Sequence, residues 1–174
     1  MRRKICYLVQ CHRSAAYTRE LFALLYSPRH IFLIHSDRKC PPELTALVSA
    51  LSDAFENVHR LDSRLVSWGG YSQVDLLISA VNHLLSLALD WSHLVVLSEQ
   101  HLPLYPSDQI AAQLPPGESL IHSSRVGDLS EAARIDVRHR FTMQYREVPG
   151  VGPFADGMSK LPEGFNDDLH HGSN

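Results

Sequence analysis

The sequence predicts an α/β fold in which a mostly parallel sheet carries helices on both faces. Short apolar runs rich in strand-forming residues alternate with longer segments whose apolar residues recur at helical spacing. Strands joined through a helix favour right-handed crossovers, which make neighbouring strands parallel. The carboxyl ends of the strands then meet at one edge, and sheets of this kind bind ligands there.

Four apolar runs are expected to form the strands of this sheet: residues 5–10, 31–34, 57–58 and 94–97. Helical spacing predicts three helices between them, and the clearest has a single apolar stripe made of Val74, Leu77, Ile78, Val81, Leu84 and Leu85. Ser14 is a candidate N-cap for the first helix, which Pro28 closes. Beyond Pro115 the pattern weakens. One short strand is expected at 119–121, and the Pro- and Gly-rich residues 147–166 are expected to be loop.

The composition is that of one ordinary globular domain. The chain has 174 residues, of which 44% are hydrophobic and 20% charged, with a net charge of -3. Neither sign of charge forms a long run, which excludes nucleic acid as a partner. The apolar stretch from Ile5 to Val9 is too short for a signal peptide or a membrane span, so we expect a soluble protein.

The cysteines and histidines match no metal or catalytic motif. Cys6, Cys11 and Cys40 show no CxxC spacing, so neither a disulfide framework nor a zinc site is expected, and a reducing cytoplasm fits best. The pairs Asp167-Asp168 and His170-His171 fit a solvated tail, or a tag remnant, better than a ligand cluster. Nucleophile elbows of the GxSxG type and Gly-rich phosphate loops are also missing from the sequence.

Four loops at the strand ends are the candidate ligand site, and they begin at Gln10, His35, Trp68 and Ser98. Asp37 stands where α/β proteins place a carboxylate that binds ribose or base, although a turn-capping Asp fits the same position equally well. A loop histidine such as His12 can contact a base, or can simply be solvated. The indole of Trp68 beside two glycines offers a flat apolar face to a ligand, and it also fits a packed turn.

Taken in order, these loops resemble the core-2/I-branching β-1,6-N-acetylglucosaminyltransferases and peptide O-xylosyltransferases, together with their bacterial relatives. The resemblance runs from about Lys4 to the last residue, and we interpret the chain as a truncated, bacterial-type member. It rests on the segments Cys6–His12, Leu25–Pro28, Ile34–Asp37, Phe55–Val58, Val66–Ser72, Trp91–His93 and Leu97–Leu104.

The resemblance implies a GT-A-like, Rossmann-related fold and a site for the uridine of a sugar nucleotide. In such enzymes the first loop and the His-x-Asp loop hold the uridine, with a tryptophan against the same nucleotide. Carried over to this sequence, the donor-binding residues are Gln10, Cys11, His12, Asp37, Arg38, Lys39 and Trp68.

The fourth loop departs from the family pattern. The family usually reads Leu-Ser-Gly-x-Asp-x-Pro-Leu, whereas here Glu99 replaces the Gly and His101 the Asp, which leaves the donor sugar and acceptor preference open. Metal-dependent GT-A enzymes hold a cation with an Asp-x-Asp motif at this strand end, and no second carboxylate stands two residues from Glu99. We therefore expect no metal and no other cofactor, so that Arg, Lys or backbone N–H groups stabilise the leaving diphosphate.

The end of the chain resembles the family's Gly-Ser-x-aromatic segment. In the family, the catalytic Glu and the basic residues that hold the diphosphate lie further along, so we expect no catalytic residue within 1–174. Residues 1–174 are then the donor-binding part of the enzyme domain, and residues 147–174 lead into an acceptor half. The acceptor-side candidates are His101, His122, Arg138, Gly172 and Ser173.

The expected activity is inverting, metal-independent transfer of N-acetylglucosamine, or of xylose, from a UDP-sugar to a glycan or hydroxyl acceptor. The 174-residue chain is expected to bind nucleotide weakly, to transfer no sugar, and to self-associate through an exposed apolar face. A cytoplasmic, bacterial location is expected. The alternatives are a non-catalytic nucleotide- or carbohydrate-binding domain and, less favoured, a metal-dependent hydrolase.

Overall fold

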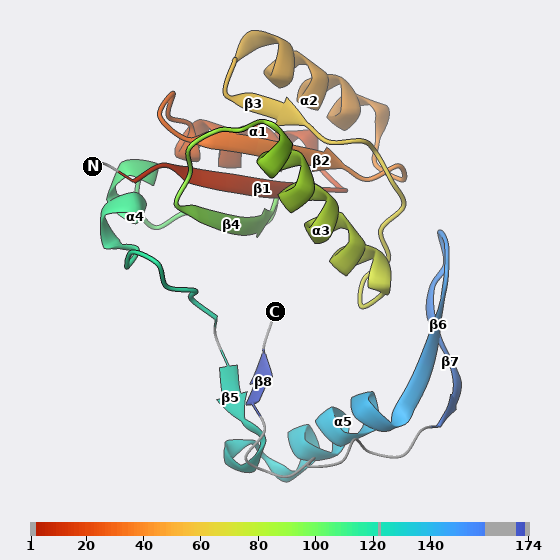
Figure 1. Ribbon diagram of the computed structural model, residues 1–174. Helices are drawn as coiled ribbons and strands as arrows, with labels where there is room; N and C mark the ends of the chain where they lie inside the picture. Colours follow the sequence, from red (N-terminus) through yellow and green to blue (C-terminus); the bar gives the residue numbers. More distant parts are fainter. Residues whose placement is uncertain (1–2, 122, 159–169, 173–174) are drawn as a thin grey trace. The chain divides into compact units, whose positions relative to one another are not determined.

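The protein consists of two compact units, Met1–Gly117 and Glu118–Asn174. The structure is a computed structural model, and it describes residues 3–121, 123–158 and 170–172 (Figure 1). The first unit contains the parallel sheet and the four loops predicted to bind a ligand. The second unit is smaller and contains two antiparallel strand pairs.

The first unit alternates strands with helices, as the sequence predicts. Its sheet has the strand order β3-β2-β1-β4, and every neighbouring pair is parallel. The strands are β1 (Ile5–Cys11), β2 (Ile31–Ser36), β3 (Val58–Arg60) and β4 (His93–Ser98). The helices are α1 (Ala15–Leu25), α2 (Pro42–Ala54), α3 (Tyr71–Ser86) and α4 (Ser107–Gln113). The predicted α/β fold is therefore confirmed.

Helices cover both faces of this sheet because side chains alternate along each buried strand. Tyr7 and Val9 of β1 share an apolar cluster with residues of α1 and α2, whereas Cys6 and Leu8 share the opposite cluster with residues of α3. Figure 1 shows β1 inside the sheet, between β2 and β4. Burial of β1 on both faces accounts for its almost unbroken apolar sequence.

Helix α3 forms where predicted but packs through a different face. Of the predicted stripe only Leu84 is buried, and the side that packs on the sheet is formed by Leu76, Ala80 and Leu84. Ile78 and Leu85 of the stripe are 47% and 61% exposed. The apolar residues of α3 cover a wide arc, so periodicity alone does not show which part of the arc meets the sheet. Ala80 at the centre of the buried side lets the helix backbone approach closely.

The second unit differs from the sequence prediction in two places. The short strand is β5 (Ser123–Arg125), which pairs with β8 (His170–Gly172), and residues 119–121 are not a strand. Much of the predicted loop is a hairpin of β6 (Met143–Val148) and β7 (Gly152–Met158). Its turn uses Gly150 at φ 79°, so glycine here marks a tight turn between strands.

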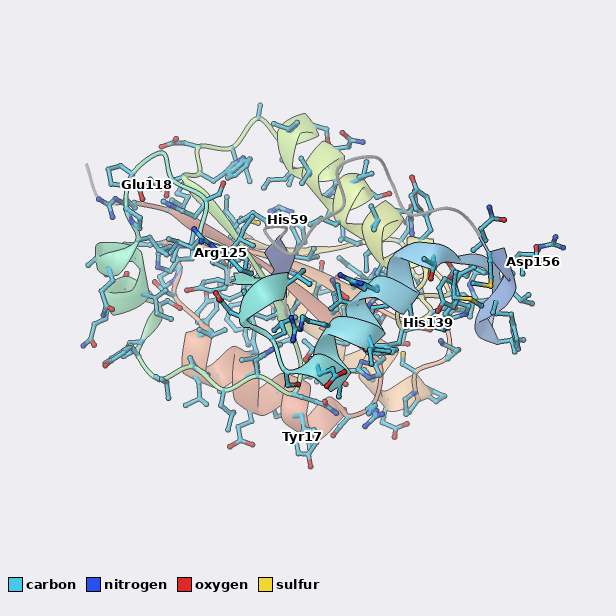
Figure 2. The ribbon with its side chains drawn as sticks, turned by 90° about the horizontal axis from the view of Figure 1, so that it is seen from below. Tyr17, His59, Glu118, Arg125, His139 and Asp156 are labelled. Carbon is cyan, nitrogen blue, oxygen red and sulfur yellow. The ribbon has the colours of Figure 1, made fainter. Side chains whose placement is uncertain are left out.

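The remaining elements of the second unit are the 3-10 turn Val126–Asp128 and helix α5 (Glu131–Thr142). Figure 2 shows Arg125, His139 and Asp156 extending from β5, α5 and β7. The last residues of the predicted loop, from 159 to 166, lie outside the described part of the chain.

The two sides of α3 give a matched pair of substitutions. Leu76→Ala should lower the free energy of unfolding by about 2–5 kcal/mol because it leaves a cavity against the sheet. Leu85→Ala removes an exposed side chain, so it should change stability by roughly 0.5 kcal/mol or less and should reduce self-association. Urea denaturation measures the first effect and sedimentation velocity the second. Equal losses of stability would contradict the observed packing face.

Candidate functional site

The four strand-end loops are tied together at the carboxyl edge of the sheet by backbone hydrogen bonds. The N–H of Asp37 donates to the carbonyl of Cys11 over 2.8 Å, which joins the β2 loop to β1. The N–H of Glu99 donates to the carbonyl of Gln10 over 3.2 Å, which joins the β4 loop to β1. The N–H of Arg38 donates to the carbonyl of Arg64 over 3.1 Å and adds the β3 loop. The structure thus brings the predicted loops to one place.

Asp37 lies inside this edge and binds the protein's own backbone. Its side chain is buried, and its two oxygens accept hydrogen bonds from the N–H groups of Lys39 at 2.7 Å and Val66 at 3.0 Å. The ammonium of Lys39 lies 3.8 Å from the same carboxylate. Of the two alternatives that the sequence left open for Asp37, these contacts favour the structural one, and ligand binding by Asp37 stays a prediction. The carboxylate organises the loops after β2 and β3, as the turn-capping alternative predicts.

Arg38 and Lys39 follow on the exposed side of the β2 loop and hold the loop after β3. Arg38 donates from its guanidinium to the carbonyl of Ser63 over 3.2 Å, and Lys39 donates from Nζ to the carbonyl of Val66 over 2.7 Å. Both residues remain exposed, and the side chain of Lys39 is 46% accessible. This places two cations at the edge where an anionic ligand would approach.

Cys11 does not offer its side chain to this site. The thiol is buried in the cluster formed with α1 and α2, and burial raises its pKa to about 12. Its contribution is the carbonyl that accepts from Asp37. The residues on either side of Cys11 are more accessible to solvent, since Gln10 is half-buried and His12 is exposed. Alternation along β1 turns Cys11 inward, a consequence that the loop motif alone does not reveal.

Trp68 projects from the loop before α3 and is 80% exposed. The loop itself is ordered, because the N–H of Gly69 donates to the amide oxygen of Gln73 over 2.8 Å and the N–H of Ser67 donates to the hydroxyl of Ser72 over 2.8 Å. Gly69 has φ 72°, a conformation that glycine adopts without strain. An exposed indole on a fixed loop can stack against a flat ring such as a base.

The sequence did not indicate a binding partner for Glu99, but the structure gives its carboxylate three contacts in the β1 loop. Its carboxylate has no exposed surface and accepts hydrogen bonds from the N–H groups of His12 at 3.2 Å and Arg13 at 2.9 Å. The ring nitrogen Nδ1 of His12 lies 3.2 Å from the same carboxylate. Its position at a strand end was the available signal, but the sequence does not show its partners.

The acceptor-side candidates are distributed over both units. His101 lies in the β4 loop of the first unit, where the N–H of Ser98 donates to its Nδ1 over 2.8 Å. Arg138 lies on α5 and Gly172 in β8, both within the second unit. His122 and Ser173 lie outside the described residues.

Among the residues that the structure describes, no group of three or more His, Cys, Asp or Glu side chains is placed to hold a metal ion. No helix in that part of the chain is long and apolar enough to cross a membrane.

His35 makes the stability of the first unit depend on pH. Its ring is buried beside Asp37, and its Nε2 accepts from the N–H of Arg64 at 3.3 Å. Burial, which disfavours the charged ring, lowers its pKa from 6.5 to about 4, while the nearby charge of Asp37 raises it and that of Arg64 lowers it further.

Because the unfolded chain protonates His35 below pH 6.5 and the folded chain does so only near pH 4, stability should fall across this window. The loss attributable to His35 is about 3 kcal/mol once the pH is below 4. Urea unfolding of wild type and His35→Gln between pH 7 and pH 4 measures it. The variant should show a shallower dependence, and an unchanged slope would contradict the assignment to His35.

The buried carboxylate of Asp37 gives a second expectation. Asp37→Ala leaves two backbone N–H groups without their acceptor, so it should lower the free energy of unfolding by about 1–3 kcal/mol. Asp53→Ala removes an exposed Asp near the end of α2 and should cost little. Thermal unfolding of both variants compares them. Equal stabilities would show that the carboxylate is not structural.

Comparison with known proteins gives the family. The model of the Core-2/I-Branching enzyme family matches residues 5–146. A probable beta-1,3-galactosyl-O-glycosyl-glycoprotein beta-1,6-N-acetylglucosaminyltransferase 7 of Sus scrofa is 27% identical over 107 residues, 61% of this chain and 25% of the relative.

Two further relatives have somewhat lower identity and longer overlaps. A beta-1,3-galactosyl-O-glycosyl-glycoprotein beta-1,6-N-acetylglucosaminyltransferase 4 of Danio rerio is 23% identical over 177 residues, 97% of this chain and 40% of the relative. A xylosyltransferase of Ciona intestinalis is 25% identical over 113 residues, 64% of this chain and 13% of the relative. The chain thus spans less than half the length of each of these relatives. With a family model that matches most of its length, the chain belongs to the Core-2/I-branching enzymes, a family of glycosyltransferases.

Proposed function

We propose that this chain carries the donor-binding part of a glycosyltransferase that takes N-acetylglucosamine, or xylose, from a UDP-sugar and transfers it with inversion to a glycan or hydroxyl acceptor. The observation that carries the proposal is the union of four strand-end loops at one edge, with exposed Trp68 on one of them. The printed names of the relatives, which are N-acetylglucosaminyltransferases and xylosyltransferases, support the two donor sugars.

Uridine and diphosphate need different chemistry, and the edge offers both. Trp68 supplies a flat apolar surface for a base, and exposed His12 can hydrogen-bond to it. The exposed cations Arg13, Arg38 and Lys39 stand on the loops after β1 and β2, where they can attract phosphate oxygens. Asp37 contributes by fixing these loops.

Metal independence is part of the proposal and follows from the state of Glu99. A cation held against a diphosphate needs carboxylate oxygens that are free to coordinate it. Glu99, the carboxylate of the β4 loop, already accepts backbone N–H groups with both oxygens and is closed to solvent. Arginine, lysine and backbone N–H groups then neutralise the leaving diphosphate.

The catalytic base, and further basic residues that complete the clamp on the diphosphate, are proposed to lie outside residues 1–174. The curated relatives are two and a half or more times as long as the part that this chain spans. The 174-residue chain is then expected to bind nucleotide and to turn over no UDP-sugar.

A non-catalytic binding domain is the second candidate, favoured by the altered β4 loop, and UDP-sugar turnover by a longer product of the gene would exclude it. A cytoplasmic location in a bacterium remains a proposal.

Titration of UDP tests the proposed function directly. Isothermal titration calorimetry should give the same dissociation constant in EDTA and in manganese, because the site uses no cation. Trp68→Ala should weaken UDP binding by about tenfold, since stacking of a base on an aromatic ring is worth roughly 1–3 kcal/mol.

Tyr105→Ala is the matched control for this experiment. Tyr105 is 51% exposed and lies two residues before Ser107, whose hydroxyl donates to the carbonyl of Leu25 at the far end of α1. It is therefore at the opposite edge of the sheet and should not affect binding. A strict manganese requirement, or an equal loss in both variants, would contradict the proposed site.

A further inference from the structure

The backbone after β1 forms an anion site that the protein fills with its own carboxylate. The N–H groups of His12 and Arg13 are consecutive and both donate to Glu99. They come directly before Ser14, whose side chain caps α1 by accepting from the N–H of Tyr17. Two consecutive backbone N–H groups that converge on one point favour a bound anion.

The occupant of this anion site comes from a different strand. Glu99 follows β4, and 86 residues separate it from Arg13 along the chain. Its side chain has no exposed surface, so it cannot contact a ligand that arrives from solvent. Its carboxylate therefore acts on other residues of the protein, and those residues belong to the β1 loop.

The contact also fixes the ring of His12. Nδ1 lies 3.2 Å from the carboxylate, and the side chain remains 43% exposed. The Nε2 atom on the far side of the ring is left for other partners. One buried carboxylate thus fixes the backbone N–H groups of His12 and Arg13 and the imidazole of His12. Because the Arg13 backbone is fixed, the point from which its side chain extends is fixed as well.

We propose that Glu99 is a positioning residue of the donor site, which occupies the anion site of the β1 loop and thereby orients His12 and Arg13 toward the nucleotide. This inference rests on the proposed function, because it assigns a nucleotide to this edge. It has a second consequence, since a donor phosphate cannot bind to N–H groups that already hold Glu99. The diphosphate must then lie toward the exposed cations.

The decisive variant is Glu99→Gly, which empties the anion site, with Glu56→Gln, a change at an exposed glutamate, as the control. UDP binding should weaken about tenfold in Glu99→Gly and stay unchanged in Glu56→Gln. Formate, added without UDP, should shift the amide NMR signals of His12 and Arg13 in Glu99→Gly and leave them unchanged in wild type. Formate should also restore much of the lost UDP affinity, because it supplies a carboxylate to the same two N–H groups.

Three results would overturn the inference: unchanged or tighter UDP binding by Glu99→Gly, no response of the two amides to formate, or no restoration of affinity. If wild-type protein binds no UDP, the proposed function fails, while the formate titration still tests the anion site by itself. Should Glu99→Gly fail to fold, Glu99→Gln keeps the shape and removes the charge. Its UDP affinity must then fall, and an affinity equal to that of wild type overturns the inference.

Discussion

The carboxyl edge of the sheet depends on two carboxylates that are closed to solvent. Asp37 accepts N–H groups from the loops after β2 and β3, and Glu99 accepts N–H groups from the loop after β1. Burial of a charge is costly unless hydrogen bonds replace its hydration, and each of these carboxylates has two backbone donors. Together they connect the loops of all four strands, so the shape of the edge follows from them.

This arrangement separates the groups that build the site from those that can meet a ligand. Because the buried carboxylates are neutralised internally, the charges presented to solvent on the β1 and β2 loops are those of Arg13, Arg38 and Lys39. The chain carries a net charge of -3, yet it presents these three cations on neighbouring loops. A local positive field attracts an anion such as a nucleotide diphosphate irrespective of the overall charge.

The four strands and the first three helices of the first unit could be predicted from sequence because their signal is local, whereas the short helix α4 was not predicted. A strand buried on both faces, such as β1, needs an unbroken apolar run, and the crossover rule then makes its neighbours parallel. The side of α3 that packs could not be predicted, since Leu76 and Ile78 both belong to one wide apolar arc. The β6–β7 hairpin was missed because glycine marks loops and tight turns alike.

The same limit applies to the site. Sequence showed which residues stand at the strand ends, and these loops do meet. It did not show which way the side chains turn, and that direction decides their roles. Cys11 and Asp37 turn inward, whereas Trp68 turns outward. Alternation along β1 sets the direction of Cys11. Asp37 is held inward because its carboxylate accepts the N–H groups of Lys39 and Val66. Lys39 is a local partner of Asp37, but Val66 lies 29 residues from Asp37 in sequence and Arg13 lies 86 residues from Glu99.

The contacts of Glu99 also bear on the proposed metal independence of this edge. To coordinate a metal ion, its oxygens would have to release the N–H groups of His12 and Arg13, which would then lose their acceptor. The ion would thus have to compensate for two lost charge-assisted hydrogen bonds before it stabilised a diphosphate. The contacts of Glu99 stay intact when exposed arginine and lysine side chains turn toward a phosphate, although Arg38 and Lys39 would give up their hydrogen bonds to the carbonyls of Ser63 and Val66. The buried glutamate therefore favours leaving-group stabilisation by side-chain cations over stabilisation by a metal.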